Sequence, residues 1–178
     1  MIRLEQFVES KFCLKGCTYC CRYNCQDSIW APYITEEEIK FFLKNDIPIF
    51  EFIDVNKRIH PVYPPLAEMH RLNQKERIRF ICPFLDLAKN ACKIYPFRPF
   101  ECRLYPFLIN RRKNKVFLAV DLNCPFVQQN RSSPRFKDYI NYLNDFFSRS
   151  RYLKTLKDNL QLIHNYKGPE DIVELKID

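Results

Sequence analysis

Nine cysteines, arranged in two groups, constrain the fold of this 178-residue chain more than any other feature. The first group contains Cys13, Cys17, Cys20, Cys21 and Cys25, and the second contains Cys82, Cys92, Cys102 and Cys124. Thiolates separated by two or three residues can bind one metal centre, because a tight turn brings their sulfur atoms together. Isolated buried cysteines, which behave as small hydrophobic residues, would explain one or two of these positions. They do not explain five within one short segment, so the pattern indicates metal binding.

The N-terminal segment bears on the compartment in which these thiols are found. Glu5 and Glu9 interrupt any apolar run there, which is unlike a signal peptide. No apolar run reaches the roughly 18 residues of a membrane span. We therefore expect a soluble, cytoplasmic protein. Thiols stay reduced in that compartment, so the cysteines favour metal or redox chemistry over a disulfide framework, and an odd number cannot pair completely.

A shortage of glycine excludes several classes of enzyme. The chain has only two glycines, Gly16 and Gly168, and they are far apart. Neither the G-x-G-x-x-G loop nor the G-x-x-x-x-G-K-[ST] loop can be written with them. Rossmann-type dinucleotide binding, P-loop nucleotide hydrolysis and a kinase fold are thereby excluded. The three histidines also lack the H-E-x-x-H pattern of common zinc proteases.

The segments outside the cysteine groups predict both helices and strands. Residues 35–38 form a capping box, with Thr35 as N-cap and Glu38 as its partner, at the start of a helix that ends near Asn45. Residues 104–110 and 115–122 predict two strands around a polar turn.

The C-terminal part predicts helix. Ser133 before Pro134 is a typical helix start. Apolar residues then recur at steps of three and four until Gly168-Pro169. We expect an α+β fold in which residues 1–130 form a cysteine-rich, metal-centred domain with a short antiparallel sheet. Residues 131–178 would form a helical extension packed on it.

The adjacent pair Cys20-Cys21 bears on the number of metal centres. Neighbouring side chains of an extended backbone point to opposite sides, so this pair favours two centres or a bridged one over a single four-cysteine site. Soft thiolate ligands select zinc or iron–sulfur clusters. Cys82-Pro83 and Cys124-Pro125 are typical of the ends of ferredoxin runs, which favours iron–sulfur, such as a 4Fe-4S cluster, over zinc.

The order of motifs around the cysteines is also informative. A cysteine run ends in Cys20-Cys21 and is followed by CPFL at Cys82, CKIY at Cys92, RPFECRLYPF from Arg98 and NCPF around Cys124. Over about Phe12 to Phe126 the chain resembles the CxxCxxCC zinc- or iron-chelating proteins, also called YkgJ-type cysteine-cluster proteins. One departure is the three residues, rather than two, between the first two cysteines.

The resemblance implies a specific set of metal ligands, with Cys25 as an extra cysteine. The eight ligands it implies are Cys13, Cys17, Cys20, Cys21, Cys82, Cys92, Cys102 and Cys124. Arg98 and Arg103 flank Cys102 and can donate hydrogen bonds toward the cluster and offset its negative charge. For Arg103, a surface salt bridge is an equal alternative.

Three classes of function follow. The first is a metal-binding protein that acts in electron transfer, in metal handling or as a metal-stabilised module, with its redox or protein partner left open. The second is a cluster-dependent modifying enzyme, because flagellin lysine methylases share similar cysteine motifs in a longer chain. The third is a zinc-dependent nucleic-acid binder, suggested by the net charge of +8 and the basic turn from Arg111 to Lys115. A solvated hairpin tip and an anionic metal site explain that charge better, so the sequence argues against nucleic acid as a partner.

Overall fold

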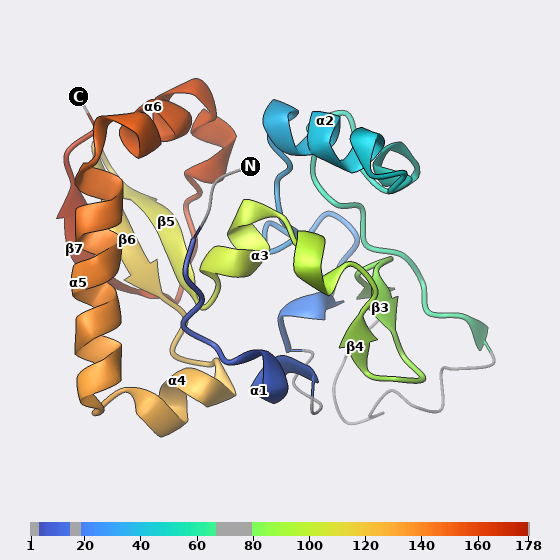
Figure 1. Cartoon of the computed structure of the whole chain (residues 1–178), viewed down its shortest axis with the longest axis horizontal. Helices are drawn as coiled ribbons and strands as arrows, with labels where there is room; N and C mark the ends of the chain where they lie inside the picture. The colour runs from blue at the N-terminus through green and yellow to red at the C-terminus, as the bar shows by residue number, and fades with distance from the viewer. Residues whose placement is uncertain (1–3, 15–18, 67–79, 178) are drawn as a thin grey trace. The chain divides into compact units, whose positions relative to one another are not determined.

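The computed structural model describes residues 4–14, 19–66 and 80–177 and separates into two compact units. The first unit comprises residues 1–4 and 9–103, and the second comprises residues 5–8 and 104–178. Both contain short helices and short antiparallel strands (Figure 1), so the fold is α+β, as predicted. The predicted domain division at residue 130 stays a prediction. Among the described helices, none combines the length and hydrophobicity that a membrane crossing requires.

The first unit is built from many short elements. In chain order they are α1 (Ser10–Leu14), η1 (Tyr19–Cys21), β1 (Arg22–Tyr23), α2 (Glu36–Lys44), η2 (Ile49–Glu51), β2 (Phe80–Ile81), β3 (Leu85–Asp86), β4 (Ala91–Cys92), η4 (Tyr95–Phe97) and α3 (Phe100–Leu104). Strand β1 pairs with β2 and β3 pairs with β4, both antiparallel. Strands of two residues contribute few hydrogen bonds of their own, so this unit depends on packing and on contacts between loops.

Helix α2 begins and ends where the sequence predicts. The Thr35 side chain accepts a hydrogen bond from the Glu38 backbone N–H, and the Glu38 carboxylate accepts one from the Thr35 N–H. This reciprocal arrangement is the predicted capping box. The apolar side of the helix carries Ile39 and Phe42 into a core that also contains Ile34 and Ile49.

The second unit contains a three-stranded antiparallel sheet. Its elements are β5 (Phe107–Arg112), β6 (Lys115–Val120), α4 (Pro125–Asn130), α5 (Pro134–Ser148), α6 (Ser150–Asp158), η5 (Leu160–Leu162) and β7 (Glu170–Leu175). The strands lie in the order β5-β6-β7. The predicted pair of strands is confirmed as β5 and β6. The first begins at Phe107 rather than residue 104, because α3 occupies the chain up to Leu104.

The C-terminal stretch differs from the sequence-based expectation in one respect. The last α-helix ends at Asp158 and the 3₁₀ helix η5 at Leu162, before Gly168-Pro169, and residues after Pro169 form β7. The pattern of apolar residues at steps of three and four did not predict this strand. Its pairing partner is β6, which lies far away in the sequence. The last six-residue strand therefore owes its conformation to tertiary hydrogen bonding rather than to local preference.

Helix α5 packs along the sheet and contacts β7 (Figure 1). Ser133 is its N-cap and accepts a hydrogen bond from the Phe136 N–H at 3.2 Å, which confirms the predicted helix start. Its buried face carries Phe136, Tyr139, Leu143, Phe146 and Phe147.

Phe7, from the short N-terminal segment of this unit, is buried among aromatic rings. Its ring meets those of Phe107, Phe126 and Phe136 edge-on at 5.2–5.6 Å between centroids. The backbone carbonyl of Phe7 also accepts a hydrogen bond from Arg135 at 2.9 Å. Aromatic pairs in this geometry stabilise a core beyond their area of contact.

Basic residues of the hairpin are engaged by carboxylates of β7. Arg112 Nε lies 3.0 Å from Asp171, and Lys115 Nζ lies 2.7 Å from Glu174. Arg112 also donates to backbone carbonyls of Tyr166 and Pro169. Part of the basic turn therefore serves the fold of the second unit itself.

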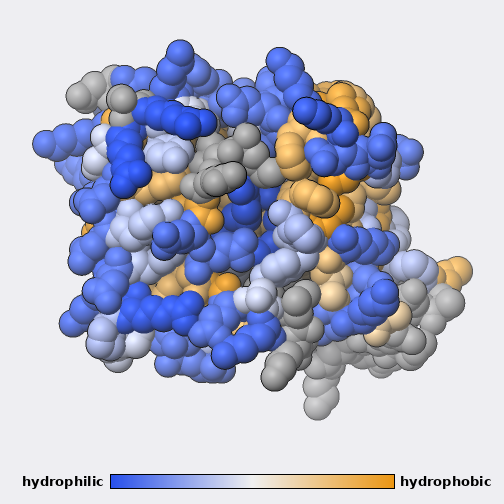
Figure 2. Space-filling model, in the orientation of Figure 1, coloured by the Kyte–Doolittle hydropathy of each residue, from blue (hydrophilic) through white to orange (hydrophobic). Residues whose placement is uncertain are grey.

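Figure 2 shows a mostly hydrophilic face, with hydrophobic residues gathered over α2.

The packing of α5 yields a test of this core. Leu143 is fully buried, whereas Asn141 on the same helix is exposed. We expect Leu143→Ala to lower the free energy of unfolding by about 2–5 kcal/mol because it leaves a cavity. Asn141→Ala should change it by less than about 0.5 kcal/mol. Urea unfolding followed by circular dichroism measures both, and equal effects of the two changes would contradict the described packing.

Candidate metal centre

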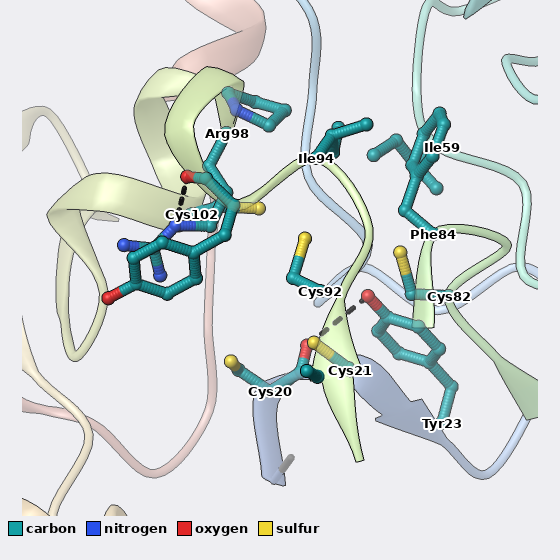
Figure 3. A pocket seen from close by; sticks show the side chains of 13 residues that line it. Cys20, Cys21, Tyr23, Ile59, Cys82, Phe84, Cys92, Ile94, Arg98 and Cys102 are labelled. Carbon is teal, nitrogen blue, oxygen red and sulfur yellow. Dashed lines mark hydrogen bonds between the residues drawn. The ribbon is translucent and has the colours of Figure 1, made fainter. Parts of the chain in front are cut away.

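Five of the eight predicted ligands line one pocket in the first unit. They are Cys20, Cys21, Cys82, Cys92 and Cys102. Their sulfur atoms are directed toward a shared space (Figure 3). The cavity volume is about 40 Å³, more than the roughly 10–15 Å³ that one water-sized guest needs. The structure thus brings two cysteines of the first group together with three of the second.

The β1–β2 pair joins the first group to the second. In its register Arg22 faces Ile81 and Tyr23 faces Phe80. The ladder continues toward the cysteines, since the Cys82 N–H donates to the carbonyl of Cys21 at 2.9 Å. Two cysteines far apart in sequence therefore occupy neighbouring positions in one backbone ladder.

The sequence led us to expect an extended backbone at Cys20 and Cys21, and this expectation is wrong. These residues belong to the 3₁₀ helix η1 rather than to an extended segment, and both side chains line the same pocket. A 3₁₀ turn separates successive side chains by about 120°, so neighbours need not face opposite sides. The number of metal centres stays a prediction.

The β3–β4 hairpin places Cys82 near Cys92. Leu85 pairs with Cys92 across the hairpin, and the Leu85 N–H donates to the carbonyl of Cys82 at 2.9 Å. The Phe84 N–H donates to the sulfur of Cys82, which favours its thiolate. Backbone N–H groups that face a sulfur are a common support for thiolate ligands.

The pKa values of four pocket thiols, Cys20, Cys21, Cys82 and Cys102, are raised by burial and by neighbouring thiols. Burial raises the pKa of Cys82 to about 12, and the nearby Cys92 and Cys20 add to this. Burial also raises the pKa of Cys102 well above its usual range, with further contributions from Cys82 and Cys20. Without a cation, the thiols therefore keep their protons at neutral pH.

The Cys20-Cys21 pair shares a hydrogen bond. That bond, together with burial, raises the pKa of Cys20 well above its usual range. In Cys21 the same bond lowers the pKa, but burial and the thiols of Cys82, Cys102 and Cys92 outweigh it, so the pKa is raised overall. The two sulfurs are thus close enough to share a proton.

Arg98 lies beside these thiols, and Arg103 lies against the buried Glu38. Arg98 lines the pocket, and its guanidinium stacks on the Tyr95 ring at 3.8 Å from the centroid. Its charge lowers the pKa values of Cys20 and Cys102 and so offsets part of the effect of burial. Arg103 does not line the pocket, and its Nη2 lies 3.6 Å from the buried Glu38 carboxylate.

Tyr23 is a pocket residue that none of the sequence motifs predicts. It is buried, and its hydroxyl donates to the carbonyl of Cys20 at 3.3 Å (Figure 3). Burial raises its pKa well above the usual range, and the surrounding thiols add to the shift. Its position two residues after the Cys-Cys pair was the available signal, but the pairing of β1 with β2 was needed to interpret it.

The remaining cysteines are placed as follows. Cys13 belongs to α1, whose backbone runs close to β4. The side chain of Cys13 and the whole of Cys17 lie outside the residues that the structure describes. Cys25 is exposed. Cys124 is a buried thiol in the second unit, at the N-cap of α4. The seven cysteines with described side chains are all thiols rather than halves of disulfides.

The donor set fits a soft metal. Five sulfur donors share one cavity, whose wall also carries the apolar side chains of Ile59, Phe84 and Ile94 and the charged side chain of Arg98. Zinc and iron–sulfur clusters are the usual guests of thiolate donors. Within residues 4–14, 19–66 and 80–177, no three histidine, cysteine or acidic side chains are arranged to hold an ion. The described thiols therefore line the cavity without forming a closed ligand set.

The raised pKa of Cys82 predicts a pH dependence of the metal-free protein. A thiol whose pKa is higher in the folded than in the unfolded state stabilises the fold at pH values below its ordinary pKa, which is 9.0 for Cys82. That stability is lost as the pH rises from there through the folded-state pKa of about 12. We expect the free energy of unfolding to fall over this range, and to fall less in Cys82→Ala. Urea unfolding at several pH values measures the difference. Parallel pH profiles for the two proteins would contradict the burial of an ionisable Cys82.

Comparisons with known proteins agree with this site. Residues 12–125 match the CxxCxxCC family, described as a "putative zinc- or iron-chelating domain". An uncharacterized protein of Methanocaldococcus jannaschii is 32% identical over 113 residues, which cover 62% of this chain and 52% of that protein. The chain thus spans about half the length of this relative. No solved structure matches the chain. Because the family match covers more than half of the sequence, the protein belongs to the CxxCxxCC family of zinc- or iron-chelating domains.

Proposed function

We propose that this protein binds an iron–sulfur cluster through its cysteine thiolates and acts in electron transfer or metal handling. The observation that supports the proposal most is the convergence of five thiols, from both cysteine groups, on one pocket. The family description, which covers zinc and iron chelation, supports metal binding in general. Zinc is the second candidate, because sets of four thiolates also suit zinc. In that case the protein would act as a metal-stabilised module.

The proposed ligand set extends beyond the pocket as described. It consists of Cys13, Cys17, Cys20, Cys21, Cys82, Cys92, Cys102 and Cys124. The proximity of α1 to β4 supports the inclusion of Cys13, and the burial of the Cys124 thiol is compatible with a ligand. Cys25, which is exposed, stays outside the set. When bound, an iron–sulfur cluster supplies one-electron chemistry, whereas zinc supplies a structural cross-link.

Residues around the thiols would support such a group. Arg98 brings positive charge to an anionic ligand set and thereby lowers the cost of ionising Cys20 and Cys102. Ile59 and Phe84 place apolar side chains beside the sulfurs. Tyr23 fixes the turn that carries Cys20 through its hydrogen bond to that carbonyl.

The other two function classes have less support. Arg112 and Lys115, which belong to the basic turn, are engaged by Asp171 and Glu174, and this weakens the case for a nucleic-acid surface there. The modifying-enzyme alternative depends on the motif similarity alone. We therefore retain metal binding, with a redox or metal-handling role, as the proposal.

Freshly purified protein tests the identity of the metal. We expect protein prepared without oxygen to contain iron and acid-labile sulfide and to absorb broadly in the visible range. Zinc without sulfide, in a colourless sample, would support the second candidate instead. Protein that retains neither metal and fails to bind either on reconstitution would overturn the proposal.

Metal removal should also destabilise the fold. Binding energy at a site assembled from distant segments becomes folding energy, so a chelator should lower the melting temperature. Cys82→Ser and Cys92→Ser should lower the bound metal and abolish this chelator effect. Cys25→Ser is the matched control and should retain both. If the control loses as much metal as the pocket variants, the assignment of ligands is wrong.

A further inference from the structure

Glu38 is a buried carboxylate that serves two helices. Only 3% of the residue is exposed. Its Oε2 accepts hydrogen bonds from the Thr35 N–H at 3.1 Å and from the Thr35 hydroxyl at 3.0 Å. Its Oε1 accepts one from the Phe100 N–H at 2.5 Å. Burying a carboxylate is costly unless such donors compensate, so the arrangement of these contacts is informative.

The capping box accounts for only one of the two oxygens. Reciprocal capping of α2 needs the bond between the Glu38 side chain and Thr35, which Oε2 makes. The contact of Oε1 with Phe100 crosses 62 residues of sequence and adds nothing to the end of α2. The second oxygen therefore serves α3, which begins at Phe100.

Helix α3 needs such an external support. It has five residues, and isolated helices of that length are not stable in water. Cys102 occupies its middle position and lines the thiol pocket. A second contact from the same region adds to the first, since the Tyr33 N–H donates to Glu101 at 2.5 Å. The chain between Tyr33 and Glu38 thus fixes the helix that presents Cys102.

Glu38 also balances a charge next to Cys102. Its Oε1 lies 3.6 Å from Arg103 Nη2, and both side chains are largely buried, at 3% and 10% exposed. Arg103 follows Cys102 directly in the sequence. Removing the carboxylate would leave the guanidinium charge without its buried counter-ion, which is strongly unfavourable.

We propose that Glu38 is the positioning residue for Cys102: its carboxylate holds the first turn of α3 and pairs with Arg103, so that the Cys102 sulfur faces the other thiols. This inference rests on the proposed metal-binding function. It predicts that a residue outside the pocket, and outside every cysteine motif, controls how tightly a metal is held.

Cobalt(II) is a suitable probe, because its thiolate charge-transfer absorption grows with the number of sulfur ligands. Metal-free wild-type protein, Glu38→Gln, Cys102→Ser and Thr35→Ala are titrated with cobalt(II) without oxygen, in competition with a chelator. Thr35→Ala is the matched control, since it breaks the capping box but leaves the carboxylate that reaches Phe100. Circular dichroism and urea unfolding monitor the fold of each variant.

We expect Glu38→Gln to weaken cobalt binding by about 10- to 100-fold, the usual effect of losing a group that orients a ligand. Its charge-transfer band should fall toward that of Cys102→Ser. Thr35→Ala should unfold at a lower urea concentration yet keep the wild-type band and affinity within a few-fold. If Glu38→Gln does not fold, Glu38→Asp, which keeps the charge but shortens its reach, should show the same loss.

Two results would overturn the inference. One is a Glu38→Gln or Glu38→Asp protein with wild-type band and affinity. The other is a Thr35→Ala protein that loses as much affinity as the Glu38 variants, because the effect would then be one of general stability. Wild-type protein without any thiolate band would instead refute the proposed function itself.

Discussion

The confinement of several thiols in one apolar cavity is the constraint on which the first unit depends. The hydrogen bond with Cys21 raises the pKa of Cys20, and burial raises the pKa values of Cys82 and Cys102, so ionising these thiols together is unfavourable without a bound cation. A soft metal bound by these sulfurs, as we propose, would resolve that conflict because it would stabilise the thiolates. The two-residue strands and the five-residue α3 are understandable as supports for that arrangement rather than as a self-sufficient scaffold.

Four described residues other than glycine adopt the left-handed backbone conformation that favours glycine. Left-handed backbone conformations fall on Asp46, Lys57, Asn90 and Lys113, with φ between 50° and 59°. Asp and Asn tolerate this region better than most residues, whereas each lysine there carries a modest cost. Asn90 directly precedes β4, and Lys113 lies in the turn between β5 and β6. The turns at Asn90 and Lys113 are therefore held by the pairing of the strands on either side.

Local chemistry explains which parts were predictable from sequence. The capping box at Thr35 and the start of α5 at Ser133 were predicted because the signal and the structure lie within a few residues. The family resemblance implied ligands from both cysteine groups, and members of both groups do line one pocket. The conformation of Cys20-Cys21, strand β7 and the second contact of Glu38 were not, because each depends on a partner many residues away.

The path of the chain through the two units affects the order in which they can form. Phe7 belongs to the second unit, but the chain then builds the first unit before it returns at residue 104. During synthesis Phe7 leaves the ribosome long before Phe107, Phe126 and Phe136, the rings that enclose it. The five pocket cysteines are all outside the ribosome once residue 102 has left the exit tunnel, and Phe107, Phe126 and Phe136 follow it. The thiol pocket can thus assemble on a nascent chain before the later residues of the aromatic core in the other unit have emerged.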